Sequence, residues 1–237
     1  MKKLVEFKNV KISLKGRVLF ENISFSLYEG DKIMLTGENG SGKSLLLELL
    51  ALGYSNFLAD RYKGLIIEGE IIDDQGKDLL NPRISRKYSY ISQTEQFYKN
   101  VTLKEYAQIS CAGIGIDFDE KRFDELLFKF RLLEKKNKKI QNNLSVGECK
   151  IIHIITRIMK LKATDIFILD EPLNHLSFKN SKIFNDIILE EINRNPSLTI
   201  LVVSHCKAIS FVNKNIYYNY QKNAMQIVEY VHYDCFQ

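Results

Sequence analysis

Residues 37–44 have the composition and order of a phosphate-binding loop (P-loop). They read Gly37, Glu38, Asn39, Gly40, Ser41, Gly42, Lys43 and Ser44. Glycines let backbone N–H groups close around phosphate oxygens, the lysine reaches the β- and γ-oxygens, and the serine hydroxyl can ligate Mg²⁺. The apolar runs 33–36 and 45–50 predict a strand before the loop and a helix after it, which is the context this motif needs. The pattern predicts binding of a nucleoside triphosphate.

A pair of carboxylates, Asp170 and Glu171, directly follows the apolar run Ile166–Leu169. Open α/β sheets bind their ligands at such strand ends. Asp170 is expected to hold Mg²⁺ directly or through water. Glu171 is placed to polarise an attacking water molecule.

The hydrophobic pattern predicts an α/β protein. Alternation indicates half-buried strands near the N-terminus and again over Leu65–Ile72, whereas the runs 166–169 and 199–203 do not alternate, as in strands covered on both faces. Helical spacing extends over residues 102–143, and another helix is expected from about Val146 to Lys160. We therefore expect a parallel core sheet of the P-loop NTPase type with flanking helices, an N-terminal antiparallel β subdomain and a helical insert.

Composition is that of a folded soluble protein. The chain has 237 residues, 45% hydrophobic and 27% charged, with a formal net charge of +5. That excess is too mild to indicate a nucleic-acid partner, and the run Lys135–Lys139 is expected to be a solvated surface. The four cysteines are scattered, and the N-terminus becomes charged too early for a secretory signal. Both features favour a cytosolic protein with reduced thiols. No apolar stretch approaches the ~20 residues of a membrane helix.

Three further segments follow the P-loop in a specific order: Gln93 at the end of a strand, Leu144–Glu148 at the start of a helix, and His205 after the last core strand. With these motifs the chain resembles a nucleotide-binding subunit of an ATP-binding cassette (ABC) protein, from about residue 4 to residue 230. The resemblance implies one nucleotide-binding domain over residues 1–237, with a helical subdomain at about 94–160.

The resemblance also implies a mechanism shared between two subunits. In this family two cassettes pair head to tail and bury two ATP molecules with Mg²⁺. Glu171 would be the catalytic base, His205 the switch histidine and Gln93 the sensor of Mg²⁺ and water, with Ser44 and Asp170 also at the metal. Ser145 and Gly147 of the signature segment would contact the γ-phosphate of the partner's ATP.

Several positions depart from the family pattern. Val146 replaces the first signature glycine, Glu148 replaces a common glutamine, and Ser177 stands where an aspartate usually couples the two sites. Leu45 replaces a threonine near the α-phosphate, and Leu14 occupies the place of the adenine-stacking aromatic. We expect a working but slow ATPase with loose base selectivity.

Two function classes remain open. The first is a subunit that energises a separate integral membrane permease as a homodimer or beside a second cassette, peripheral on the cytoplasmic face of the cell membrane. Residues 98–105 resemble the region where such cassettes receive their membrane partner, and the short C-terminal end favours export over import. The alternative is a soluble ATPase of the iron–sulfur assembly type. A degenerate cassette is disfavoured because Lys43, Asp170, Glu171 and His205 are present.

Overall fold

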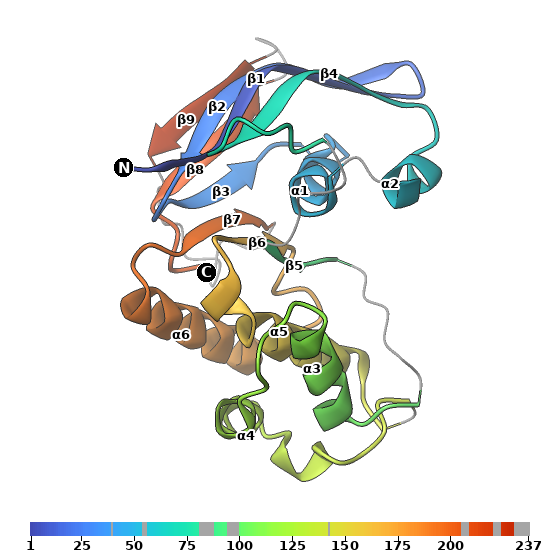
Figure 1. Ribbon diagram of the computed structural model, residues 1–237, viewed down its shortest axis with the longest axis vertical. Helices are drawn as coiled ribbons and strands as arrows, with labels where there is room; N and C mark the ends of the chain where they lie inside the picture. The colour runs from blue at the N-terminus through green and yellow to red at the C-terminus, as the bar shows by residue number, and fades with distance from the viewer. Residues whose placement is uncertain are drawn as a thin grey trace.

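The computed structural model describes residues 1–38, 40–53, 56–80, 88–93, 100–141, 143–204, 209–219 and 224–229. A three-stranded antiparallel sheet of order β2-β1-β4 forms one end of the molecule (Figure 1). Its strands are β1 (Lys3–Leu14), β2 (Arg17–Tyr28) and β4 (Leu65–Asp73). Lys15 and Gly16 join β1 to β2 with φ of 50° and 78°, the paired left-handed geometry of a tight hairpin turn.

The larger sheet has the order β5-β6-β7-β3-β8-β9. All neighbouring pairs are parallel except β8 and β9, which pair antiparallel. Because β7 lies between β3 and β6, the sheet brings the ends of two strands distant in sequence to the same edge. The strands are β3 (Lys32–Thr36), β5 (Tyr88–Ile91), β6 (Ile166–Asp170), β7 (Thr199–Val203), β8 (Lys214–Asn219) and β9 (Ala224–Glu229).

The helices lie on both sides of this sheet (Figure 1). Helices α1 (Lys43–Leu52) and α2 (Asn56–Arg61) lie on the side of the antiparallel sheet, and the other helices lie on the opposite side. Those are α3 (Leu103–Ala112), α4 (Glu120–Lys129), α5 (Val146–Ile158) and α6 (Phe178–Arg194), with 3-10 turns η2 (Leu133–Lys135) and η3 (Leu161–Ala163).

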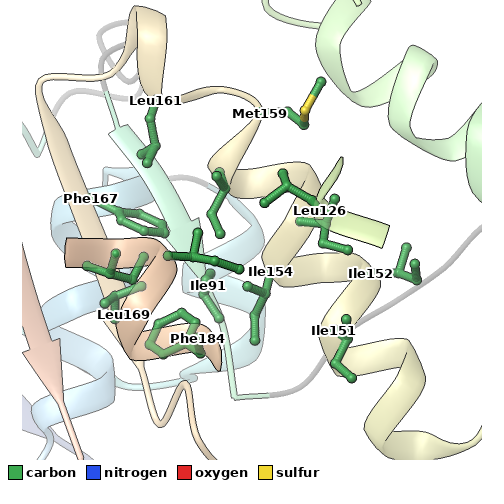
Figure 2. Close-up of a cluster of buried hydrophobic side chains, with 14 of the residues drawn as sticks. Ile91, Leu126, Ile151, Ile152, Ile154, Met159, Leu161, Phe167, Leu169 and Phe184 are labelled. Carbon is green, nitrogen blue, oxygen red and sulfur yellow. The ribbon is translucent and has the colours of Figure 1, made fainter. Parts of the chain in front are cut away.

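Alternating side chains of the central strands enter two different hydrophobic cores. Ile166 and Ile168 of β6 belong to the core that contains α1 and the antiparallel sheet. Phe167 and Leu169 belong to the core formed with the helical layer. Figure 2 shows this second core, where they gather with Ile154 of α5 and Phe184 of α6. The absence of alternation in the sequence of β6 thus reflects burial on both faces.

The expected fold class is confirmed, with a parallel core sheet, flanking helices and an antiparallel N-terminal sheet. The strands seen in the N-terminal sequence merge into two long strands, because β-bulges in β1 interrupt the alternation without ending the pairing. Over the described residues, no helix combines the length and the apolarity needed to cross a bilayer.

Candidate functional site

The P-loop follows β3 and ends in α1, whose N-cap is Gly42. Gly42 has φ of 94°, a left-handed conformation that disfavours other residues. A Cβ at this position would also lie 2.9 Å from Cε2 of the buried Phe20. Conformation and space therefore both require glycine here, and they fix how the loop enters the helix.

The Lys43 side chain bends back over the loop. Its Nζ donates hydrogen bonds to the carbonyl oxygens of Gly37 (2.9 Å) and Glu38 (2.7 Å) and to Oγ of Ser41 (3.3 Å). Burial lowers the pKa of Lys43, and the nearby carboxylates of Glu171 and Asp170 oppose that shift. The Lys43 ammonium thus lies inside the curve of the P-loop and interacts electrostatically with the Asp170 and Glu171 carboxylates.

Ser44 and Asp170 meet directly although they are far apart in sequence. Oγ of Ser44 donates to Oδ1 of Asp170 at 3.0 Å, and the Tyr90 hydroxyl donates to Oδ2 at 3.4 Å. Burial raises the pKa of Asp170, and these two hydrogen bonds act against that rise. A hydroxyl beside a carboxylate supplies the hard oxygen donors that Mg²⁺ prefers, so the residues fit that cation.

Glu171 is buried and adopts a left-handed backbone conformation with φ of 48°. Its N–H donates to the carbonyl of Val203 on β7 at 2.9 Å, and Pro172 follows it. Non-glycine residues in this region are strained and occur often at functional sites. The direction of the Glu171 side chain is therefore set by the turn that follows β6 and not by the alternation of the strand.

One pocket of about 470 Å³ collects most of the residues that the sequence singled out. Lys43, Ser44, Leu45, Glu171 and Gln93 all line it. Leu14 belongs to the same lining, which consists of Leu14, Lys15, Arg17, Leu19, Gly40, Ser41, Gly42, Lys43, Ser44, Leu45, Tyr62, Gln93, Glu171 and Val203. Asn39 and His205 lie outside the described residues, as do positions 94–99 of the expected partner-binding region.

The signature segment is not part of this pocket. Ser145 is the N-cap of α5 and forms a capping box: its Oγ accepts from the Glu148 N–H at 3.2 Å, and its own N–H donates to Glu148 Oε2 at 2.8 Å. Glu148 also pairs with Lys135 at 2.6 Å. The glutamate that replaces the common glutamine therefore completes a helix cap. Val146 is exposed, with 68% relative accessibility.

Gly147 packs against the turn that follows the carboxylate pair. A Cβ added to it would lie 2.7 Å from the carbonyl oxygen of His175. Ser177 is the N-cap of α6, and its hydroxyl accepts from the Asn180 N–H at 3.3 Å. Aspartate caps helices as well as serine does, so the substitution at this position preserves the helix start.

Several residues at the site escaped the sequence analysis. Nζ of the buried Lys150 on α5 donates to the carbonyl of Ser92, next to Gln93, at 2.8 Å. Glu48, one turn after Ser44, is buried and pairs with Arg61 of α2 at 2.7 Å. Burial raises the pKa of Glu48, against the effects of Tyr62 and Arg61. Lys135, expected in a solvated run, is tied to Glu148.

The fold and the pocket together define a P-loop ATPase. A parallel sheet presents the phosphate-binding loop, a hydroxyl–carboxylate pair and a strained glutamate at one edge. The structure is similar to one described as an ATP-binding subunit of an ABC transporter, with a TM-score of 0.77 over 95% of this chain and 90% of that chain at 21% identity. That likeness concerns the fold.

Sequence comparison identifies the family. The ABC transporter family profile matches residues 20–174. The ergothioneine transport ATP-binding protein EgtV of Helicobacter pylori (strain G27) is 29% identical over 86% of this chain and 91% of its own length. The cytochrome c biogenesis ATP-binding export protein CcmA of Reclinomonas americana is 32% identical over 76% and 75%. A probable metal transport system ATP-binding protein of Thermotoga maritima is 25% identical over 91% and 83%.

The chain belongs to the ABC transporter family. It is an ATP-binding protein and an ATPase of that family.

Proposed function

We propose that this chain hydrolyses ATP in a head-to-tail pair of cassettes and thereby energises a separate membrane-spanning partner. One observation carries the proposal: the buried Glu171 lines the same pocket as Lys43 and Gln93, directly after the Asp170 that bonds Ser44. A carboxylate base, an ammonium for the phosphates and donors for a divalent cation thus converge. That set suits phosphoryl transfer to water.

Each residue takes a role in the hydrolysis. The backbone N–H groups of Gly40, Ser41 and Gly42 and the N-terminus of α1 bind the phosphates, with Lys43 at the β- and γ-oxygens. Glu171 orients the attacking water and accepts its proton. Ser44, Asp170 and Gln93 would hold Mg²⁺, and the bound cation would neutralise charge on the phosphates. His205 contacts the γ-phosphate.

Ser145 and Gly147 act on the ATP of the opposite cassette. The Ser145 hydroxyl accepts a hydrogen bond from the Glu148 N–H, which leaves its own proton available for a phosphate oxygen. The N-terminus of α5 adds its dipole at the same place. Pairing of two cassettes, identical or different, therefore completes each site.

The partner is an integral membrane permease on a separate chain, and the cassette acts at the inner face of the cell membrane. The relatives named as ATP-binding proteins of transport systems support this assignment. For the direction of transport we propose export, which is supported by the relative named as an export protein.

A tagged Glu171→Gln variant tests the proposal. Removing the base should lower ATP hydrolysis at least ~100-fold and leave ATP binding within about twofold of wild type. With ATP and Mg²⁺, the trapped variant should co-purify from detergent-solubilised native cells with a second cassette and a polytopic membrane protein. The double variant with Lys43→Ala is the matched control, because it should lose the nucleotide and the partner together.

Two outcomes would contradict the proposal. Unchanged hydrolysis by Glu171→Gln would remove Glu171 from the chemistry. Capture of soluble proteins alone, with the cassette absent from membranes, would favour a soluble assembly ATPase instead.

A further inference from the structure

Glu48 occupies an unusual place on α1. It follows Ser44 by four residues, so the two side chains lie on the same face of the helix. Long helical side chains lean toward the N-terminus of their helix, which directs Glu48 over the turn that contains Ser44. Oγ of Ser44 bonds Asp170 at 3.0 Å. The helix geometry therefore places Glu48 near Ser44, and the charge of Asp170 acts on Glu48, although Glu48 does not itself line the pocket.

The hydrogen bonding of Glu48 is incomplete. The residue is 3% exposed, and its Oε1 accepts a hydrogen bond from Arg61 at 2.7 Å. Its Oε2 is buried and accepts no hydrogen bond of good geometry from the described residues, although the Tyr62 hydroxyl is close enough to lower the pKa of the carboxyl. A buried acceptor without a well-placed donor is costly and uncommon in folded proteins. The oxygen is thus suited to a further, better-placed donor.

The residues around Glu48 connect it with the pocket. Tyr62 lines the pocket, and both Glu48 and Asp170 help to raise the pKa of its hydroxyl, after burial as the main cause. Burial, Asp170 and Glu48 also raise the pKa of Tyr90, whose hydroxyl donates to Asp170. The two phenols thus share the electrostatic environment of both carboxylates.

We propose that Glu48 is an outer-sphere carboxylate of the magnesium site, accepting a hydrogen bond from the hydration shell of the cation. Mg²⁺ retains several water molecules in proteins, and these are strong donors. The negative charge of Glu48 would then add to that of Asp170 in attracting the cation. The inference rests on the proposed function, because it requires that Ser44 and Asp170 hold this cation.

A purely structural ion pair between Glu48 and Arg61 explains fewer of these observations than a role at the metal site does. Arg61 satisfies Oε1 only, and its side chain is 43% exposed while that of Glu48 is 4% exposed. A surface-linked pair of this kind contributes little to stability when one partner must be desolvated. The structural role predicts no effect on the cation, which separates the two explanations.

Nucleotide binding with and without the metal tests the inference. The dissociation constant of a fluorescent ATP analogue is measured in excess EDTA and in saturating Mg²⁺. Glu48→Gln retains the size of the side chain and an acceptor for Arg61 but loses the charge. We expect binding in EDTA within about twofold of wild type and a loss of about tenfold in the Mg²⁺ enhancement, as for other outer-shell partners.

Matched variants make the result specific. Glu48→Asp, which keeps the charge, should restore part of the enhancement. Glu190→Gln, the same exchange in the surface pair of Glu190 with Lys129, should change neither constant. Tyr62→Phe gives a second measurement that does not depend on the folding of Glu48→Gln. We expect a loss of a few-fold in the Mg²⁺ enhancement, taken as the ratio of the two constants so that any change common to both conditions cancels, because Tyr62 lines the pocket.

The outcomes for the two proposals differ. If wild type itself shows no Mg²⁺ enhancement, the metal site of the proposed function and this inference both fail. If wild type shows the enhancement and both Glu48→Gln and Tyr62→Phe retain it, only the role of Glu48 is overturned. Equal weakening in EDTA and in Mg²⁺ would assign Glu48 to structure and overturn the inference as well.

Discussion

Gly147 packs so closely against the backbone carbonyl of His175 that a Cβ on Gly147 would lie 2.7 Å from that oxygen. This contact joins the first turn of α5 to the segment that follows the Asp170–Glu171 pair. Helix α5 also contacts the other side of the site, because Lys150 donates to the carbonyl next to Gln93. The start of α5 is therefore in contact with two segments that flank the pocket.

Gly147→Ala should destabilise the protein by about 1–2 kcal/mol and lower ATP hydrolysis. Alanine gains about 1 kcal/mol in helix propensity over glycine, but overpacking against a backbone atom costs roughly 1–3 kcal/mol, and we expect the clash to dominate. Chemical denaturation and ATPase assays check this result. Gly113→Ala is the control, because its Cβ would lie no closer than 3.4 Å to Ile109. A stabilised Gly147→Ala protein would show that the turn moves freely.

Gly42→Ala should weaken ATP binding by about tenfold or more. The left-handed conformation costs an alanine roughly 1–2 kcal/mol, and its Cβ would meet the buried ring of Phe20, so the loop must shift from its phosphate-binding shape. Gly40→Ala, in the same loop, separates the two effects. Its φ of 72° is similarly left-handed, but its Cβ would meet no atom within 4 Å. Isothermal titration with ATP should show a smaller loss for Gly40→Ala, and equal losses for both variants would contradict the role of Phe20.

The leucine at position 14 should leave the base weakly recognised. We expect wild type to prefer ATP over GTP by less than about tenfold, with slow turnover. Leu14→Tyr should tighten ATP binding by about 0.5–1.5 kcal/mol, roughly two- to tenfold, on the scale of aromatic pairs. Leu14→Met, of similar volume without a ring, should have no such effect. Fast turnover together with strong ATP preference in wild type would contradict this expectation.

Lys160 should give stability a distinct pH dependence. Burial, with help from Arg157, lowers its pKa from 10.5 to about 8. Between these values the unfolded chain binds a proton that the folded protein does not, so stability rises with pH, and below about pH 8 the charged lysine costs folding free energy in full. Lys160→Met should therefore stabilise the protein by about 1–3 kcal/mol near pH 7 and by only about a quarter of that near pH 10, where most of the unfolded lysine is still protonated.

Denaturant unfolding of wild type and Lys160→Met at several pH values checks this prediction. The buried tyrosines titrate in both proteins, so their contribution cancels in the difference. A difference in stability that does not change between pH 7 and 10 would show that Lys160 keeps an ordinary pKa.

Local patterns were sufficient to identify segments that the fold brings together at the candidate site. The P-loop and the Asp170–Glu171 pair are short segments in which the chemistry and the backbone geometry are encoded together, and they meet because β3 and β6 flank β7. Glu48 was not predictable in this way. A glutamate within a run of leucines is typical of the solvated position of an amphipathic helix. Here Glu48 is buried and pairs with Arg61 on α2, and hydrophobic periodicity does not predict such a partner.

Contacts that depend on distant segments were missed for the same reason. The pairing of Lys135 with Glu148, and of Lys150 with the Ser92 carbonyl, joins segments whose proximity follows only from packing. The single-domain arrangement over residues 1–237, the subdomain at about 94–160 and the roles of all the site residues, Asn39 and His205 among them, stay predictions.

The central strands contribute to both hydrophobic cores, with Ile166 and Ile168 of β6 on one side and Phe167 and Leu169 on the other. Neither core can open without exposing one face of the same strands to water. The two halves of the molecule should thus melt in a single cooperative transition, despite their different architectures. A ligand bound at the ends of these strands would then raise the melting temperature of the helical layer and of the antiparallel sheet by the same amount.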